Sequence, residues 1–222
     1  MPSEVQLDRY AAPRRSMVEA QLRARGLADE RVLEAMTLVP RHEFVAEQER
    51  DRAYEDHPLP IGEGQAVSQP YIVGLMLGSL GLLPSHRVLE IGTGTGYQTA
   101  LLAELAQQVY SIERHESLAQ QARETLARLG YRNVTFLVAD GSAGLPAEAP
   151  FDAIVVAAAA PRIPPSMFEQ LAEGGRMVIP VGPAQSQDLQ LIRKLEGRAV
   201  VGSLGGCAFV PLIGGQGYAS GW

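Results

Sequence analysis

Residues 88–96 read VLEIGTGTG, and the fold of the chain follows from this stretch. The apolar run around Glu90 predicts a buried parallel strand, and the glycines that follow, Gly92, Gly94 and Gly96, predict a tight loop at its carboxyl end. A glycine backbone can turn sharply and let a ligand approach its amides, because it carries no Cβ. Residues 97–105 favour a helix, so we expect a helix N-terminus after the loop that can receive a polar or anionic ligand.

The glycine spacing separates two kinds of nucleotide site. The dinucleotide fingerprint GxGxxG would need glycine at position 97, where this chain has Tyr97, so a nicotinamide or flavin enzyme is disfavoured. The spacing ExGxGxG instead resembles motif I of the class I methyltransferases, which bind S-adenosylmethionine in a Rossmann-like sheet. The motif alone is also compatible with a glycine-rich strand-to-helix turn in some other α/β protein.

Composition bounds the class of protein. The chain has 222 residues, 46% of them hydrophobic, and no internal repeat, so we expect one globular unit with a sizeable core. Its net charge of −6 and the lack of a basic stripe disfavour a nucleic-acid partner. The first residues lack the apolar core of a signal peptide and no apolar run could span a bilayer, so we expect a cytoplasmic protein without a membrane partner. The single cysteine, Cys207, excludes an internal disulfide, and we interpret it as a small buried hydrophobe.

Helical patterns dominate before residue 41. Residues 1–12 are expected to form a loose terminus, and apolar residues at helical spacing predict a helix over 13–25, closed by Gly26. Asp29 is placed to cap a second helix, which Pro40 ends.

The stretch from 41 to 69 lacks periodicity. His42 and His57 have no further ligand at a metal-binding spacing, so we interpret them as polar loop histidines and predict no metal site. Residues 58–69 are expected to form an irregular loop rich in proline and glycine that leads into a helix over 70–80. A connection of this length in a compact domain is usually functional.

From residue 86 the pattern alternates between strands and helices, which predicts right-handed crossovers and a mostly parallel sheet. The expected elements are strands over 87–91, 109–112, 134–138, 151–157 and 176–181, with helices over 116–129 and 164–172. Residues 189–195 and 199–212 are expected to add antiparallel strands. We therefore predict an α/β, Rossmann-like core (residues 85–222), on which N-terminal helices and a loop (residues 1–84) pack as one globular unit.

Acidic residues end three of the predicted strands, namely Glu90, Glu113 and Asp140. In an open α/β sheet the ligand crevice lies outside the carboxyl ends of the strands, and a carboxylate about 20 residues past the first glycine binds ribose hydroxyls. Asp140 with Gly141 would accept a hydrogen bond from an adenine amine. Taken singly, each acid reads better as a helix cap or a surface ion pair, but three in register favour a cofactor site.

Five segments together resemble the protein-L-isoaspartate (D-aspartate) O-methyltransferase family. They are DERVLEAMTLVPRHEFV (29–45), AYEDHPLPIGEGQAVSQPYIVGLM (53–76), RVLEIGTGTGYQTALLAELA (87–106), APFDAIVVAAAAPRIPPSMFEQLAEGGRMVIPVGP (149–183) and FVPLIG (209–214). The segment around GQxxSQPY is the specific part, because motif I is shared by the wider superfamily.

The resemblance implies an activity. Enzymes of this family use S-adenosylmethionine to methylate the α-carboxyl of L-isoaspartyl residues in damaged proteins and peptides, and release S-adenosylhomocysteine. The ester then closes to a succinimide without the enzyme, and hydrolysis returns some normal aspartate. Isoaspartyl proteins and peptides would be the partners, and we expect the chain to be a monomer.

The resemblance also implies site residues. Ser68 matches the active-site serine of the family. The expected cofactor contacts are Gln65, Ala66, Val67, Ser68, Glu90, Gly92, Thr93, Gly94, Thr95, Gly96, Glu113, Asp140 and Gly141. The chain departs from the family at Ala66, where a threonine is usual, at Ala139, where the family's GDG begins, and at Ile213, where some members have a threonine near the cofactor.

The expected chemistry asks little of the side chains. A carboxylate is already a nucleophile near pH 7, so methyl transfer needs no strong base, no metal and no covalent intermediate. Rate would come from holding the reacting atoms in line, an effect that reaches effective molarities of about 10⁵ to 10⁸ M. Ser68 would then donate a hydrogen bond that orients the substrate carboxylate. Its alternative role is an N-cap for the helix that begins at Pro70.

Other functions stay in view. Ala66 leaves open a paralogue retuned to another acidic peptide, and a cofactor-binding protein without catalysis is the non-enzyme alternative. A nucleic-acid methyltransferase is disfavoured, because the fourth strand ends in VVAAAAP rather than Asn/Asp-Pro-Pro-aromatic. A catechol-type enzyme would need metal carboxylates that the sequence does not show.

Overall fold

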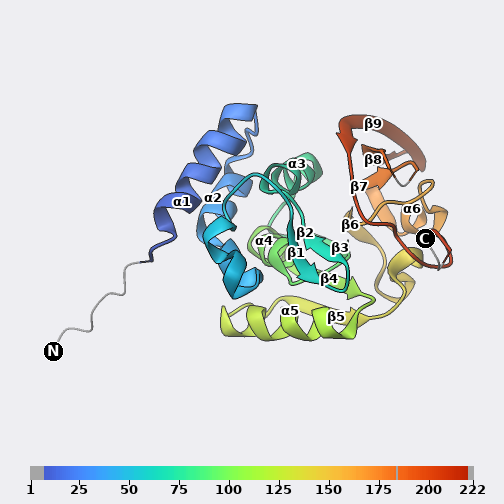
Figure 1. Cartoon of the computed structure of the whole chain (residues 1–222). Coiled ribbons are helices and arrows are strands. Elements are labelled where there is room, and N and C mark those ends of the chain that lie inside the picture. Colours follow the sequence, from blue (N-terminus) through green and yellow to red (C-terminus); the bar gives the residue numbers. More distant parts are fainter. Residues whose placement is uncertain (1–7, 184, 220–222) are drawn as a thin grey trace.

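A seven-stranded sheet forms the centre of the protein (Figure 1). The computed structural model describes residues 8–183 and 185–219. The strand order is β5-β4-β3-β6-β7-β8-β9; pairs among the first five are parallel, and β8 and β9 are antiparallel. The strands are β3 (Arg87–Ile91), β4 (Gln108–Glu113), β5 (Val134–Val138), β6 (Phe151–Val156), β7 (Leu171–Val181), β8 (Gln187–Leu195) and β9 (Arg198–Cys207). This confirms the predicted sheet with its antiparallel end.

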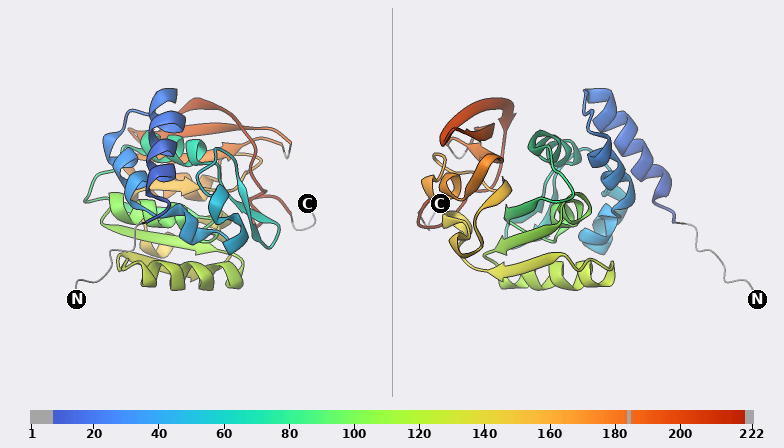
Figure 2. Two further views of the ribbon diagram at one scale, coloured as in Figure 1. Left: turned by 60° about the vertical axis from the view of Figure 1, so that its left-hand side comes forward. Right: turned by 180° about the vertical axis from the view of Figure 1, so that it is seen from behind.

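The two faces of the sheet carry different layers, because successive side chains of a strand point to opposite faces. Val88 of β3 packs with one hydrophobic cluster, whereas Leu89 and Ile91 pack with a second cluster that includes Met167. The first face is covered by α3 (Pro70–Leu80), α4 (Tyr97–Leu105) and α5 (Glu116–Arg128), and the second by the short α6 (Pro165–Glu169). In Figures 1 and 2 the N-terminal helices lie outside α3 and α4, on the side away from the sheet.

The N-terminal helices belong to the same core as the sheet. Met17 and Leu22 are fully buried in the cluster that contains Val88. The predicted helix begins earlier than expected, as α1 (Ala11–Ser16), and continues through a π-helical segment (Met17–Leu22) and a 3-10 turn (Arg23–Arg25). Residues on both sides of position 84 thus share one core, and the division into 1–84 and 85–222 stays a prediction.

The end of the first helix and the start of the second are each fixed by one residue. Gly26 ends the first helix in the left-handed region, with φ of +90°. Asp29 caps α2 (Glu30–Leu38) by accepting hydrogen bonds from the amides of Arg31 and Val32, which confirms the predicted cap. The prediction of a loose terminus is wrong for residues 10–12. Tyr10 is buried and stacks on His42, with 4.1 Å between ring centroids. Residues 1–7 lie outside the described part.

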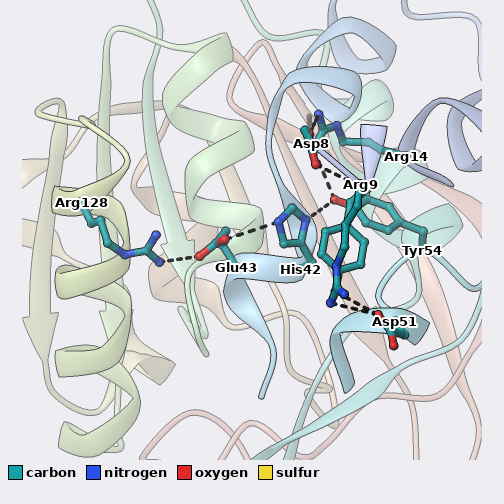
Figure 3. Close-up of polar contacts among 9 residues, drawn as sticks. Asp8, Arg9, Arg14, His42, Glu43, Asp51, Tyr54 and Arg128 are labelled. Atoms are coloured by element: carbon teal, nitrogen blue, oxygen red, sulfur yellow. Dashed lines mark hydrogen bonds and ion pairs between the residues drawn. The ribbon is translucent and has the colours of Figure 1, made fainter. Parts of the chain in front are cut away.

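His42 is not the polar loop histidine that we predicted. The residue is 8% exposed, and its Nδ1 lies 2.7 Å from the hydroxyl of Tyr54. Its Nε2 lies 3.4 Å from Glu43, which pairs with Arg128 of α5 (Figure 3). Burial lowers the pKa of His42. The aromatic partners come from residues 10 and 54, so no local pattern revealed this packing.

The segment expected to be an irregular loop contains a β-hairpin. Strands β1 (Leu59–Gly62) and β2 (Gln65–Val67) pair antiparallel, with Pro60 opposite Ala66. The turn between them has positive φ at three successive residues, including +52° at Glu63. Proline and glycine within such short strands read as loop signals, which is why the sequence did not predict the hairpin.

Two C-terminal boundaries also differ from the prediction. The helix expected over 164–172 is only α6, because Leu171 already pairs with Phe151 at the start of β7. The last strand ends at Cys207 rather than at 212. The chain after it returns to the sheet, where the Ala159 amide donates to the Val210 carbonyl at 2.8 Å. Among the described residues, no helix is long and apolar enough to cross a membrane.

Candidate active site

The glycine loop joins β3 to α4 at the carboxyl edge of the sheet. The backbone angle φ lies between +54° and +95° at Gly92, Gly94 and Gly96, a region that residues with a side chain rarely adopt. A Cβ at position 96 would also lie 2.5 Å from Cδ1 of Leu126 in α5. Gly96 therefore lets α5 pack closely against the loop, and the loop conformation follows from the predicted spacing.

Glu90 lies beneath this loop rather than in a cavity. Its side chain is fully buried, and it accepts hydrogen bonds from the hydroxyls of Ser111 (2.6 Å) and Thr99 (2.5 Å) and from the amide of Gln98 (3.1 Å). Burial raises the pKa of Glu90 to about 7. Glu90 thus ties β3 to β4 and to the first turn of α4. Its predicted contact with the cofactor stays a prediction, and the geometry supports a role in positioning the loop.

A first cavity of about 370 Å³ opens at the ends of β3 and β4. Its apolar walls include Ile91, Ile112 and Leu212, and Gly92 and Glu113 lie on its inner side. The carboxylate of Glu113 accepts hydrogen bonds from the amides of Gly94 (2.9 Å), Arg114 (2.8 Å) and His115 (3.0 Å). The volume lies in the range of small-molecule sites, and the mixture of apolar walls with one fixed carboxylate fits an adenosine group.

Gly141 and Asp140 differ in their access to this cavity. Gly141 lines it together with Ala139, but the side chain of Asp140 does not. The Asp140 carboxylate accepts hydrogen bonds from the amides of Ser142 (2.8 Å) and Gly215 (3.0 Å). Burial alone would raise the pKa of Asp140, but the hydrogen bonds from these amides hold that pKa below its ordinary value. The helix-cap interpretation therefore describes Asp140 in this structure, and its contact with adenine stays a prediction.

A second, smaller cavity of about 60 Å³ adjoins the first. The hairpin residues Gln65, Ala66, Val67 and Ser68 form one side of it, and the loop residues Gly92, Thr93, Gly94 and Thr95 form the other. Both cavities are lined by Gln65, Gly92 and Glu113, so they lie side by side. The structure therefore brings together most of the predicted cofactor residues, while Glu90, Gly96 and Asp140 line neither cavity.

A third cavity of about 350 Å³ lies on the far side of Ser68. Ser68 and Ala66 line both this cavity and the second one, so they stand at the boundary between them. Ala157 and Val210 line all three cavities. Neither was among the predicted residues, although Ala157 follows a strand end and Val210 lies in the FVPLIG segment. Cys207 also lines this cavity, where burial raises the pKa of its thiol to about 11.

Ser68 does not cap the helix that follows it. The cap residue of α3 is Gln69, whose side chain makes no capping hydrogen bond to the first turn of the helix. Instead, Asp56 accepts the hydrogen bond of the Tyr71 amide at 3.2 Å. The Ser68 hydroxyl is therefore not needed for the helix, and Ser68 stands between the small second cavity and the large third cavity.

The family model for protein-L-isoaspartate (D-aspartate) O-methyltransferase (PCMT) matches residues 13–217. The chain belongs to this family. A protein-L-isoaspartate O-methyltransferase from Koribacter versatilis is 54% identical over 219 residues, which are 99% of each chain. One from Methanoculleus marisnigri is 57% identical over 205 residues, 92% of this chain and 93% of that protein.

Among the described residues, no group of three or more His, Cys, Asp or Glu side chains could hold a metal ion.

Solved structures of the same family share the fold. A protein-L-isoaspartate O-methyltransferase superposes with a TM-score of 0.81 at 31% identity, over 91% of this chain and 66% of that one. A putative family member from Plasmodium falciparum, in complex with S-adenosyl-L-homocysteine, gives a TM-score of 0.77 at 28% identity, over 89% of this chain and 96% of that one. The Rossmann-like class I methyltransferase fold is thus confirmed.

Proposed function

We propose that this chain transfers a methyl group from S-adenosylmethionine to the α-carboxyl of L-isoaspartyl residues in proteins and peptides. The observation that carries this proposal is the position of Ser68 at the boundary between the second cavity, which adjoins the first, and the third cavity. An adenosine group would lie beside Glu113 and Gly141, and the methionine portion between the hairpin and the glycine loop. The third cavity would receive the isoaspartyl residue.

The reaction needs orientation more than activation. Bound S-adenosylmethionine supplies an electrophilic methyl group, and a substrate carboxylate oxygen forms the new bond to that carbon as its bond to sulfur breaks. The carboxylate is ionised near pH 7. No proton has to be removed, so the chain's contribution is to hold the oxygen in line and to exclude water. The methyl ester leaves, and succinimide formation follows without the enzyme.

Ser68 is the residue that we propose to orient the carboxylate. Its hydroxyl can donate one hydrogen bond to a substrate oxygen, and the helix does not require it. A hydrogen bond to a charged group contributes about 1.5 to 3 kcal/mol, so its loss corresponds to roughly 10- to 150-fold in rate.

The test is Ser68→Ala, assayed for methyl transfer to an isoaspartyl peptide and, separately, for binding of S-adenosylhomocysteine. We expect turnover to fall by roughly 10- to 150-fold while affinity for the cofactor product changes little. Unchanged turnover would remove the assignment of Ser68.

The proposal also covers the cofactor contacts, the oligomeric state and the location of the protein. The cofactor contacts are Gln65, Val67, the loop from Gly92 to Thr95, Glu113 and Gly141. The chain acts as a monomer, so light scattering should give a mass near 23.9 kDa. It works in the cytoplasm, where isoaspartyl proteins and peptides are its partners.

A further inference from the structure

Arg41 is a buried cation that no part of the methyl-transfer scheme has used. It lies in a 3-10 turn (Arg41–Phe44), and its side chain has no solvent exposure. Its Nε donates to the Ala53 carbonyl at 2.7 Å, and its Nη2 donates to the Ser68 carbonyl at 2.8 Å. The guanidinium carbon lies 4.7 Å from the ring centroid of Tyr97, the first residue of α4.

This arrangement is costly for a group that serves packing alone. Among the described residues no carboxylate lies within ion-pair distance of Arg41, although the charge of Asp56 acts on it, and its Nη1 is buried without a hydrogen-bond partner. Burial lowers the pKa of Arg41. Apolar side chains of similar volume usually replace a buried ionic group without loss of stability, so its presence here calls for a geometric reason. The hydrogen bond from Arg41 to the Ser68 carbonyl supplies such a geometric reason.

We propose that Arg41 is a positioning residue for methyl transfer, which fixes the backbone of Ser68 so that its hydroxyl stays at the boundary between the cavities. The inference rests on the proposed function, because it deepens the role of Ser68. The rigid fork of a guanidinium can hold two carbonyls at once, whereas a lysine ammonium is a point charge on a flexible stem. Arg41 thereby joins the Ala53 region to the Ser68 segment.

The residues after Ser68 are held by hydrogen bonds to Asp56, which leaves the Ser68 carbonyl to Arg41. Asp56 accepts hydrogen bonds from the side chain of Gln69 (2.8 Å) and from the amide of Tyr71 (3.2 Å). Asp56 also pairs with Arg25 at 2.7 Å. Loss of the Arg41 contact should therefore release residue 68 without unfolding α3. A small displacement of an orienting group has a large effect on a reaction that depends on alignment.

The test is a double-mutant cycle with Arg41→Lys and Ser68→Ala, measured as methyl transfer to an isoaspartyl peptide. We expect Arg41→Lys to lower kcat by about tenfold or more in the wild-type background, and by less than about twofold when Ser68 is already alanine. Binding of S-adenosylhomocysteine should stay within about threefold, because the glycine loop is intact. An equal loss of kcat in both backgrounds, or no loss in the first, would overturn the inference.

Arg31→Lys is the matched control. Arg31 also donates to two backbone carbonyls, those of Leu82 and Leu105, but it lies away from the three cavities. It should cost stability and leave kcat unchanged. If Arg41→Lys and Arg41→Gln both lose S-adenosylhomocysteine binding, Arg41 is structural and the inference fails. If the wild-type chain forms no methyl ester at all, the proposed function fails instead.

Discussion

Glu90→Gln replaces the buried carboxyl beneath the glycine loop by a neutral amide of the same shape. In the wild-type protein two hydroxyls, from Ser111 and Thr99, and the amide of Gln98 donate to this carboxyl. Hydroxyls can rotate and the Gln98 amide can turn over, so a glutamine at position 90 can keep most of these hydrogen bonds. The main change is that position 90 can no longer ionise.

The magnitude follows from the pKa of Glu90, which burial raises from 4.5 to about 7. Between these values the folded chain keeps a proton that the unfolded chain has lost. Stability from this group is therefore complete below pH 4.5 and is lost as the pH rises through 7, at about 1.4 kcal/mol per pH unit. From pH 5 to pH 8 the loss is about 2 to 3 kcal/mol, and the glutamine variant should not suffer it.

The assay is equilibrium urea unfolding of both proteins at pH 5 and pH 8. Other titrating groups are common to the two proteins, so their contributions cancel in the difference. Relative to the wild type, the variant should gain about 2 to 3 kcal/mol of unfolding free energy between the two pH values. A difference that is the same at both pH values would refute the idea that Glu90 is a buried carboxyl with a raised pKa.

Three other substitutions probe the site. Ala66→Thr adds a hydroxyl at the boundary of the second and third cavities and should raise turnover by roughly 2- to 10-fold in initial-rate assays; a fall would show that the hairpin is shaped for another substrate. Glu63→Ala removes the 2.7 Å hydrogen bond from the Ser117 hydroxyl, which ties the hairpin turn to α5, so stopped-flow chase should show release of S-adenosylhomocysteine faster by about threefold or more. An unchanged release rate would contradict this tie. Gly96→Ala forces a Cβ toward Leu126 at φ of +95° and should cost about 2 to 4 kcal/mol in urea unfolding, whereas a cost below about 0.5 kcal/mol would contradict the close packing.

The sheet could be predicted because its signals are local. The apolar strand at Arg87–Ile91 forms as expected, and the glycines after it turn with the positive φ that their spacing suggests. The central parallel strands β3 and β6 bury residues on both faces, so they read as nearly continuous apolar runs. The hairpin at residues 59–67 could not be predicted in this way, because its strands are only three or four residues long and the first of them contains proline and glycine.

The site was predicted less completely than the sheet. Sequence places a carboxylate at a strand end but does not give the direction of its side chain. Glu113 lines the first cavity, whereas Glu90 points into the core and Asp140 accepts a hydrogen bond from the amide of Gly215, 75 residues further along the chain. The role of Arg41 was also invisible, because it depends on a carbonyl 27 residues away. Contacts between distant segments leave no local pattern.

The activity itself can be measured with two peptides of identical sequence, one with an L-isoaspartyl residue and one with normal L-aspartate. The purified chain is incubated with methyl-labelled S-adenosylmethionine, and base-labile methyl esters are counted as volatile methanol. Esters should form on the isoaspartyl peptide, with little or no signal from the aspartyl peptide. Equal labelling of both peptides, or no ester on either one, would contradict the proposed substrate.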